Sequence, residues 1–506
     1  MGTGVSRRTG GQSTLDHDSL PWRCCVETEG LSDPHPIFDR RSSGLLVHLS
    51  SLPGPHGIGD LGPAAHGFID WLVAAGQTFW QMLPVGPIGC GFSPYSSTSA
   101  FAGEPLYISI EGLEQDGLLD RSEIPAFADQ DRCHVDFEAV AAFKKPLFRI
   151  AHSRFRERFD QWSGPYERFI HENASWLEHW IDFVGNDRDY ETFLQFMFDH
   201  QWSNMHRHAR DRGILLLGDV PIFVVADSAD VKSNPELFRL DQHGNPEVLT
   251  GTPPDQFTDT GQLWGHPHYQ WGAHQASEFR WWRDRIRVQL ERFDALRIDH
   301  FIGFHHAYEI QADASDATSG TWVEAPGRDF FGCLQDAHGV LPLIAEDLGV
   351  MTPEIVSMRD DFGFPGMRVL HNAFGEEDSP DLPHNHPHCS VAYTGTHDND
   401  TTVGWWATLP DEDRDRAILY GGLEPGEIHI GMIRLALTSP ANTAIVPIQD
   451  LLGLGSDARM NIPGTAEGNW TWRLDGDLLS SELAESYREE CRTCGRMREH
   501  SPESQD

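Results

Sequence analysis

Eight short apolar runs, spread between residues 44 and 451, constrain the fold of this chain more than any other feature. Most are continuous rather than alternating, as is typical of parallel strands buried on both faces. Helical patterns lie between many of them, for example at residues 64–75, 276–292 and 353–362. Such alternation predicts an α/β fold, and eight units predict a closed (β/α)8 TIM barrel. The runs are residues 44–52, 79–85, 214–222, 295–301, 341–348, 366–370, 391–397 and 444–451.

Two connections between these runs are too long for a simple crossover and predict insertions after strands two and three. Residues 86–213 must form a subdomain, whose later part has the apolar spacing of helices. Residues 225–274 are rich in Gly, Pro, Asp and aromatic residues, and their position predicts a segment that overhangs the barrel mouth. We therefore expect a disordered extension at residues 1–36, one catalytic barrel at 37–485 with these insertions, and a polar tail at 486–506.

Three carboxylates stand at the downstream ends of three runs: Asp299, Glu346 and Asp398. A (β/α)8 barrel builds its active site at the carboxyl ends of its strands. Two carboxyl groups that flank a sugar linkage suffice for glycoside chemistry, one as nucleophile and one as general acid and base. A third acid can hold the substrate's hydroxyls. The pattern therefore predicts an enzyme that acts on glycosidic bonds.

The neighbours of Asp299 and Glu346 suit them to different roles. Arg297 lies two residues before Asp299, so both side chains point to the same side of the strand, and its charge favours the ionised carboxylate that a nucleophile requires. Glu346 follows an apolar run, and burial near a second carboxylate raises the pKa of a general acid. A structural Arg–Asp pair is the alternative for Arg297 and Asp299. Asp347 is the competing acid, although it should point to the opposite face.

Asp398 directly follows His397, and the two side chains can hydrogen-bond adjacent hydroxyls of one sugar ring. The alternative for Asp398 is the N-cap of a helix, because the surrounding loop is rich in Asp, Asn and Thr. Two groups of metal-type ligands also occur, but we expect neither to bind a metal, since the second is a lone CxxC. They are His384, His386, His388 and Cys389, and the pair Cys491 and Cys494.

The charge of the chain excludes several classes of partner. Its 506 residues include 38 Lys and Arg against 77 Asp and Glu, a net charge of −39, which disfavours nucleic acid and anionic membranes. No apolar run is long enough to span a bilayer, and no apolar segment follows Arg7 and Arg8, so we expect a cytoplasmic protein with free thiols. Only three cations are lysine. This indicates either a coding bias or adaptation to concentrated salt.

Six ordered motifs resemble glycoside hydrolase family 77, the 4-α-glucanotransferases (amylomaltase, disproportionating enzyme). They are residues 92–101, 218–224, 297–303, 345–349, 395–402 and 459–473, and the resemblance covers roughly residues 40–480. It implies that Asp299 is the nucleophile, Glu346 the acid/base and Asp398 the acid that stabilises the transition state. Residues 251–257 look like the family's flexible loop beside the cleft. The substrate-binding candidates that the resemblance implies are Tyr95, Asp219, Asp255, Phe257, Trp264, Arg297, His300 and His397.

The resemblance implies an enzyme that moves segments of an α-1,4-glucan to a 4-hydroxyl of glucose or of another α-1,4-glucan, by retaining double displacement. Its partners would be maltooligosaccharides and longer glucans, and it would need no cofactor, because both half-reactions are carboxylate chemistry. One alternative is a hydrolytic α-glucanase of the amylase type, although the third run ends in Asp219-Val-Pro-Ile rather than in the usual amylase sequence. The other is an inactive glucan-binding scaffold, against which all three acids are present.

Overall fold

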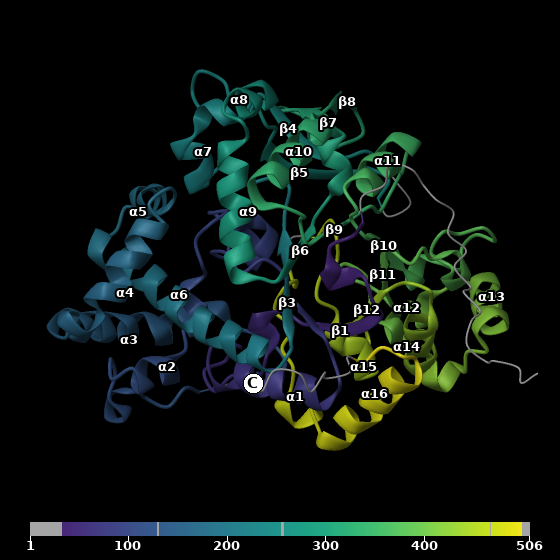
Figure 1. Cartoon of the computed structure of the whole chain (residues 1–506), viewed down its shortest axis with the longest axis horizontal. Coiled ribbons are helices and arrows are strands. Elements are labelled where there is room, and N and C mark those ends of the chain that lie inside the picture. Colours follow the sequence, from purple (N-terminus) through teal and green to yellow (C-terminus); the bar gives the residue numbers. More distant parts are fainter. Residues whose placement is uncertain (1–32, 129–130, 255–257, 466, 498–506) are drawn as a thin grey trace, which may run out of the picture.

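The predicted barrel is present in the computed structural model, which describes residues 33–128, 131–254, 258–465 and 467–497. Eight parallel strands follow one another around the barrel in chain order, and the last pairs with the first (Figure 1). Each strand overlaps one of the eight predicted runs. The strands are β1 (Ser42–Leu46), β2 (Phe79–Gln81), β3 (Leu215–Val220), β6 (Ala295–Ile298), β9 (Leu343–Ala345), β10 (Gly366–Val369), β11 (Ser390–Tyr393) and β12 (Thr443–Pro447).

The barrel strands are continuous apolar runs because both of their faces are buried. Every residue of β1, β6, β9, β11 and β12 is buried. Several predicted runs are longer than the strands, since buried apolar residues continue into the turns that follow. The first run, for example, includes the buried 3-10 turn Leu49–Ser51, which lies beyond the end of β1.

Helices follow most of the barrel strands and surround the barrel (Figure 1). The helix predicted at 276–292 begins only at Arg280, because Glu278 and Phe279 both have a φ of 52° and separate it from the helix before it. The helices are α1 (Pro63–Ala74), α2 (Ile110–Gln115), α3 (Phe137–Glu157), α4 (Phe159–Glu172), α5 (Leu177–Val184), α6 (Arg188–Asp211), α7 (Ala229–Ser233), α8 (Trp271–Ala276), α9 (Arg280–Arg292), α10 (Gly327–His338), α11 (Pro353–Asp361), α12 (Thr402–Thr408), α13 (Asp411–Gly421), α14 (Ile428–Thr438), α15 (Ile448–Leu451) and α16 (Ser481–Thr493).

The insertion after β2 is helical, as predicted, and lies to one side of the barrel with α3, α4 and α5 outermost (Figure 1). A buried ion pair ties it to the barrel: Lys144 Nζ on α3 lies 2.7 Å from Asp60 Oδ2, just before α1. The same ammonium donates to the carbonyls of Leu106 and Ile108 at 2.8 and 3.0 Å. Both charged side chains are almost completely buried, at 0% and 1% exposure, so removal of either partner would leave an unpaired charge inside the protein.

The insertion after β3 contributes half of a second sheet that the sequence did not predict. Its strands β4 (Val248–Thr252) and β5 (Gln262–Pro267) join β7 (His306–Gln311) and β8 (Gly320–Glu324), which follow β6, in the antiparallel order β5-β4-β7-β8. Figure 1 shows this sheet at the top of the molecule, beside α8 and α10. The second sheet therefore lies on one side of the barrel and joins two separate segments of the chain, the insertion after β3 and the residues that follow β6.

The expected polar tail from residue 486 is wrong for the residues that the structure describes there. Helix α16 continues to Thr493 and packs on α1, with Ala484, Tyr487 and Cys491 buried. Beyond it, Arg496 is fully buried, and its Nη1 donates to the carbonyls of Ser42 and Asn442, next to the seam between β1 and β12. The expected extension at residues 1–36 lies almost wholly outside the described residues. Within the described ranges, no helix combines the length and apolarity needed to cross a bilayer.

Candidate active site

Two of the three predicted acids come directly after barrel strands, and the third lies in a loop. Asp299 follows β6 and Glu346 follows β9, both at the carboxyl end of the barrel. The seventh predicted run ends too late, because β11 stops at Tyr393 and Asp398 lies five residues further on. Contacts through neighbouring side chains nevertheless link all three acids into one site.

Arg297 forms the charged centre of this site. Its Nη1 donates to both carboxylate oxygens of Asp219, at 2.9 and 2.7 Å, and lies 2.9 Å from Asp299 Oδ1. Asp219 is buried and also accepts a 2.8 Å hydrogen bond from the Tyr95 hydroxyl. The Asp299 side chain is 28% exposed. The Arg297 guanidinium therefore pairs with a buried carboxylate, that of Asp219, and with an accessible one, that of Asp299.

The surroundings of Glu346 favour its protonated form at neutral pH, where an ordinary carboxyl group is ionised. Its two oxygens accept backbone hydrogen bonds, from His300 at 2.7 Å and from Leu348 at 3.1 Å. Burial, reinforced by Asp299 and opposed by Arg297, raises the pKa of Glu346 to about 8. At neutral pH the site therefore offers a proton from Glu346, which is what a general acid requires.

Asp347, the competing acid, has a structural role. It is 4% exposed, it pairs with Arg359, and its Oδ1 accepts a 2.7 Å hydrogen bond from the backbone of Met367 on β10. Both interactions lie outside the contacts that join the three acids. Asp347 therefore connects the end of β9 with β10 and α11.

Asp398 is fixed by partners that sequence reasoning did not assign. Asn461 Nδ2 donates to Asp398 Oδ1 at 2.6 Å, Arg459 donates to its carbonyl at 2.7 Å, and His397 Nε2 lies 3.4 Å from Oδ2. The N-cap alternative is wrong, because Thr401 caps α12 by accepting from the backbone of Gly404. The Asp398 side chain is 45% exposed and free to meet a ligand.

Aromatic rings line the approach to these acids. The Tyr95 ring stacks on His397 with centroids 5.1 Å apart, and so connects Asp219 with the Asp398 loop. The Trp264 ring on β5 meets His300 edge-on at 4.8 Å. Burial lowers the pKa of His300 to about 4, so its imidazole is neutral at pH 7. The candidates Asp255 and Phe257 lie outside the described residues.

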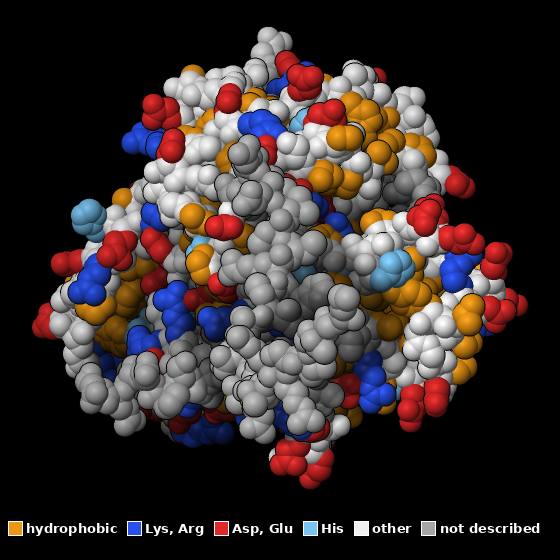
Figure 2. Space-filling view, turned by 45° about the vertical axis from the view of Figure 1, so that its right-hand side comes forward, with side chains coloured by type: hydrophobic (Ala, Val, Ile, Leu, Met, Phe, Trp, Pro, Cys, Tyr) orange, Lys and Arg blue, Asp and Glu red, His pale blue; other side chains and the backbone are white. Residues whose placement is uncertain are grey.

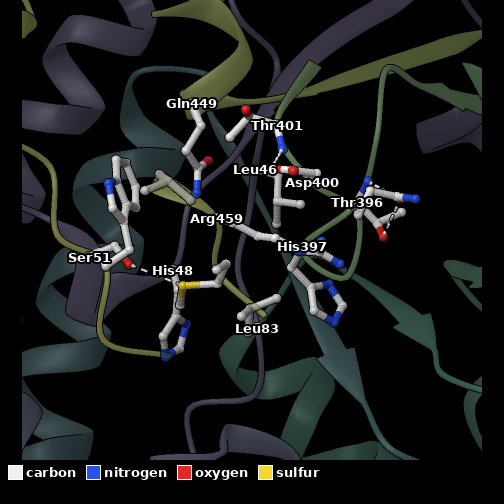
Figure 3. A pocket seen from close by; sticks show the side chains of 14 residues that line it. Leu46, His48, Ser51, Leu83, Thr396, His397, Asp400, Thr401, Gln449 and Arg459 are labelled. Atoms are coloured by element: carbon white, nitrogen blue, oxygen red, sulfur yellow. Dashed lines mark hydrogen bonds between the residues drawn. The ribbon is translucent and has the colours of Figure 1, made fainter. Parts of the chain in front are cut away.

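A pocket lined by Leu46, His48 and Gln449, among others, adjoins His397 on the side of β1 and β12. Figure 3 shows His48 and His397 on opposite sides of it, with Gln449 and Thr401 at the far end. Arg459, which holds the Asp398 loop, also lines this pocket. The pocket therefore extends the candidate site from the Asp398 loop toward the seam between β1 and β12.

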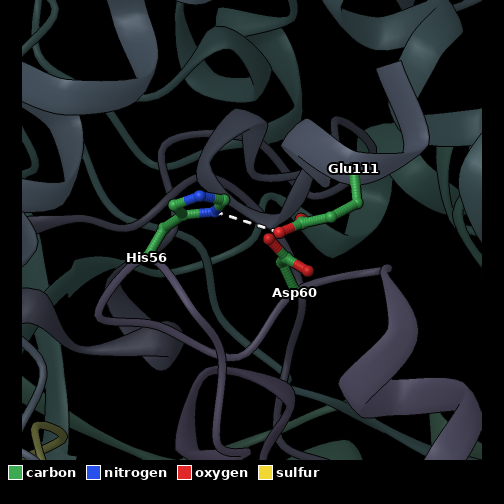
Figure 4. Close-up of side chains that lie close together, drawn as sticks. All are labelled: His56, Asp60 and Glu111. Atoms are coloured by element: carbon green, nitrogen blue, oxygen red, sulfur yellow. Dashed lines mark ion pairs between the residues drawn. The ribbon is translucent and has the colours of Figure 1, made fainter. Parts of the chain in front are cut away.

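The histidines considered as metal ligands each have a separate partner. His384 Nδ1 pairs with the Tyr420 hydroxyl at 2.9 Å, His386 Nε2 with the Asp381 carbonyl at 2.8 Å, and His388 Nδ1 with the Pro440 carbonyl at 3.0 Å. The described residues hold one convergent group of metal-type ligands, His56, Asp60 and Glu111 (Figure 4). There Asp60 is already neutralised by the ammonium of Lys144.

A (β/α)8 barrel with carboxyl groups gathered at the carboxyl ends of its strands is typical of one class of enzyme, those that act on glycosidic bonds. The sequence profile of 4-alpha-glucanotransferases matches residues 47–185 and 184–479. The chain belongs to this family, glycoside hydrolase family 77, as the resemblance predicted. The family supports glucan transfer over the hydrolytic alternative.

Relatives and solved structures agree with the family. The chain is 42% identical over 487 residues to a 4-alpha-glucanotransferase of Synechocystis sp., which covers 88% of this chain and 96% of the relative. It is 41% identical over 489 residues to the 4-alpha-glucanotransferase of Thermus thermophilus, covering 87% and 96%. The amylomaltase from Streptococcus agalactiae in complex with acarbose superposes with a TM-score of 0.87 at 34% identity, covering 91% of this chain and 100% of that one.

Proposed function

We propose that the protein cuts an α-1,4-glucan and transfers the released segment to the 4-hydroxyl of glucose or of another α-1,4-glucan, with retention of configuration. The observation that carries this proposal is the contrast between two carboxyl groups. Asp299 is paired with Arg297, whereas burial raises the pKa of Glu346 to about 8. A retaining mechanism needs this combination of an ionised nucleophile and a protonated acid.

In the first half-reaction, an Asp299 oxygen bonds to the anomeric carbon as the bond to the leaving oxygen breaks. Glu346 gives its proton to that oxygen, so the released chain carries a 4-hydroxyl. In the second, Glu346 takes the proton of the acceptor's 4-hydroxyl, whose oxygen displaces Asp299. Arg297 stabilises Asp299 as the leaving carboxylate.

The other candidate residues divide between substrate contact and support. Asp398 and His397 are suited to hold ring hydroxyls, since Asp398 is 45% exposed and both belong to one loop. Asp219 is buried beneath Arg297 and Tyr95, and acts by orienting them. We propose that Asp255 and Phe257, which lie outside the described residues, also contact substrate. No cofactor enters either half-reaction.

Transfer competes with hydrolysis for the glycosyl group on Asp299. An acceptor wins over the more abundant water only if it is bound and oriented while water is excluded. Tyr95 and Trp264 provide aromatic surface beside Arg297 and His300 for that purpose. Donor and acceptor are then both maltooligosaccharides or longer glucans, and acarbose, the ligand of the amylomaltase structure, should compete with them.

The test is incubation with maltotriose followed by chromatography of the products. We expect glucose together with a ladder of longer maltooligosaccharides and little net gain in reducing ends. Trp264→Ala should lose transfer more than hydrolysis. If the wild-type protein raises reducing ends in step with substrate loss and makes no longer chains, the hydrolase replaces the transferase. If it does not act on maltotriose at all, the scaffold alternative stands.

A further inference from the structure

Three metal-type ligands that the proposed reaction does not use converge where the barrel meets the helical insertion. His56 and Asp60 lie in the loop between the 3-10 turn Leu49–Ser51 and α1, and Glu111 lies in the first turn of α2. One ligand atom from each residue lies within 4.8 Å of the other two. Figure 4 shows the His56 ring and the two carboxylates turned toward one another. Two segments of the chain therefore supply one group of ligands.

His56 is the member of this group that points to a bound ion. The residue is 6% exposed, and its Nδ1 is buried with no hydrogen-bond partner among the described residues. Oε1 of Glu111 lies 3.7 Å from this nitrogen, which is too far for a hydrogen bond. Buried polar atoms are normally partnered, so a buried imidazole nitrogen that faces two carboxylates needs an explanation. An ion held between the nitrogen and the carboxylates gives one.

The spacing of the ligands suits zinc. Neighbouring ligands of a tetrahedral zinc ion lie about 3.4 Å apart, because the bonds to nitrogen and oxygen are about 2.1 Å long. The 3.7 Å between His56 and Glu111 is close to that separation. The Glu111 side chain is 20% exposed, so it has room to move inward and leaves a route to solvent. Burial lowers the pKa of His56, so its ring is neutral at pH 7, as a metal ligand must be.

Neighbouring contacts hold two of the ligands in place. The His56 ring stacks on Phe143 of α3, with ring centroids 4.9 Å apart. Asp60 Oδ1 accepts a 3.0 Å hydrogen bond from the backbone of Gly62, and Asp60 Oδ2 pairs with Lys144. Contacts of this kind orient the ligands of a metal ion. The imidazole and this carboxylate are thus positioned before an ion arrives.

The charge of the group accommodates a cation even though Lys144 is present. Asp60 and Glu111 together contribute −2 and Lys144 contributes +1, which leaves −1 when His56 is neutral. Among the described residues no Lys or Arg pairs with Glu111, since the nearby Arg121 pairs with Glu114 at 3.6 Å. A Zn²⁺ ion changes the sum to +1, which is no larger in magnitude, and supplies the cation that Glu111 lacks. The imidazole favours zinc over calcium and magnesium, which prefer oxygen ligands.

We propose that His56, Asp60 and Glu111 form a zinc site, with a water molecule as the fourth ligand. The ion is structural, because it joins the loop that follows β1 to α2 of the helical insertion and takes no part in the transfer reaction. Lys144 already attaches α3 to Asp60, and zinc attaches α2 to the same carboxylate. The site does not depend on the proposed function.

The experiment titrates the metal-free full-length protein with Zn²⁺ and measures its melting temperature with Zn²⁺ or with a chelator. Two variants remove a ligand atom and keep the packing. His56→Phe keeps a ring against Phe143, and Glu111→Gln keeps an acceptor for the Ser109 hydroxyl. The wild type should bind one zinc ion tightly and melt at a higher temperature with it. Each variant should bind that ion at least about tenfold more weakly and lose most of the rise in melting temperature.

The controls separate this site from loose binding at the surface, where Figure 2 shows many Asp and Glu side chains. Glu114→Gln changes the same helix outside the group, and His134→Phe removes an exposed histidine that pairs with Asp131. Both controls should bind zinc as the wild type does. Equal weakening in controls and site variants would overturn the proposal and leave surface binding only. So would the lack of a tightly bound equivalent in the wild type, or tighter binding of Ca²⁺ or Mg²⁺ than of Zn²⁺.

Cobalt substitution of the wild type tests the site without any variant and so does not depend on whether the variants fold. Co²⁺ bound to one nitrogen and three oxygens in a tetrahedral site should give a strong visible absorption band that one equivalent of Zn²⁺ removes. A weak band, typical of octahedral Co²⁺ at surface carboxylates, would contradict the proposal.

Discussion

Replacement of Glu346 by glutamine should change the stability of the fold in a pH-dependent way, from a small loss relative to the wild type near pH 5 to a gain near pH 8. Burial raises the pKa of Glu346 from 4.5 to about 8, so the folded protein keeps a proton that the unfolded chain releases. The folded state therefore binds more protons than the unfolded state between pH 4.5 and 8, and wild-type stability falls as the pH rises through that window. Glutamine is neutral at every pH and removes this dependence.

The magnitude follows from the two pKa values. Each unit of pKa difference corresponds to about 1.4 kcal/mol, and the side chain is buried, so screening by solvent is weak. From pH 5 to pH 8 the wild type should lose about 3–4 kcal/mol that Glu346→Gln retains. The carboxamide oxygen replaces only one of the two acceptors for His300 and Leu348, which costs about 1 kcal/mol at all pH values. The change with pH of the difference in unfolding free energy is therefore more informative than the size of that difference at any one pH.

Urea unfolding of both proteins at a series of pH values, with refolding limbs that coincide, measures the difference. The matched control is Glu123→Gln, because hydrogen bonding from Arg154 lowers the pKa of Glu123. A lowered pKa contributes stability above the unfolded value, so the control should be less stable than the wild type by an amount constant from pH 5 to 8. A constant difference for Glu346→Gln as well would refute the idea that the site holds this acid protonated.

Three further outcomes are expected. Asp299→Ala should abolish turnover. Glu346→Ala should be slowed by about 10²–10⁴-fold on glucans but should regain activity on donors with good leaving groups when a small anion is added. Equal rescue of both variants would contradict the roles assigned to the two residues. Lys144→Met should destabilise the protein by about 3–5 kcal/mol in urea titrations, because it leaves Asp60 buried and unpaired, and unchanged stability would contradict that reading. The melting temperature should rise between low and molar salt as the charge of −39 is screened, and a flat or falling curve would leave coding bias as the reason for the scarcity of lysine.

The barrel could be predicted from the sequence because its strands are buried on both faces, which leaves a continuous apolar signal. The second sheet could not, since its four strands come from two segments of the chain and β8 is mostly exposed. Helix α16 has a helical sequence pattern, but its polar composition led to the prediction of a tail. Ser480 caps the helix, and the buried residues Ala484, Tyr487 and Cys491 recur at i, i+3 and i+7.

In the candidate site, too, some features could be predicted from the sequence and others could not. Asp299 and Glu346 follow strands directly, so strand prediction was enough to place them at the barrel mouth. Asn461 and Arg459 reach Asp398 from more than 60 residues away in the chain. Local pattern carries no information about that contact, and only a fold that brings the two loops together reveals it.

The seam between β1 and β12 has a consequence for how the protein is made. The hydroxyls of Ser42 and Thr443 meet across this seam at 3.2 Å although 401 residues separate them, and Arg496 braces it further on. At about 5–20 residues per second, a ribosome needs roughly 20–80 s to synthesise the intervening chain. Throughout that time one edge of β1 has no partner, and an unpaired strand edge invites association with other chains. Nascent chains of this protein should therefore depend on protection until their last barrel strand emerges.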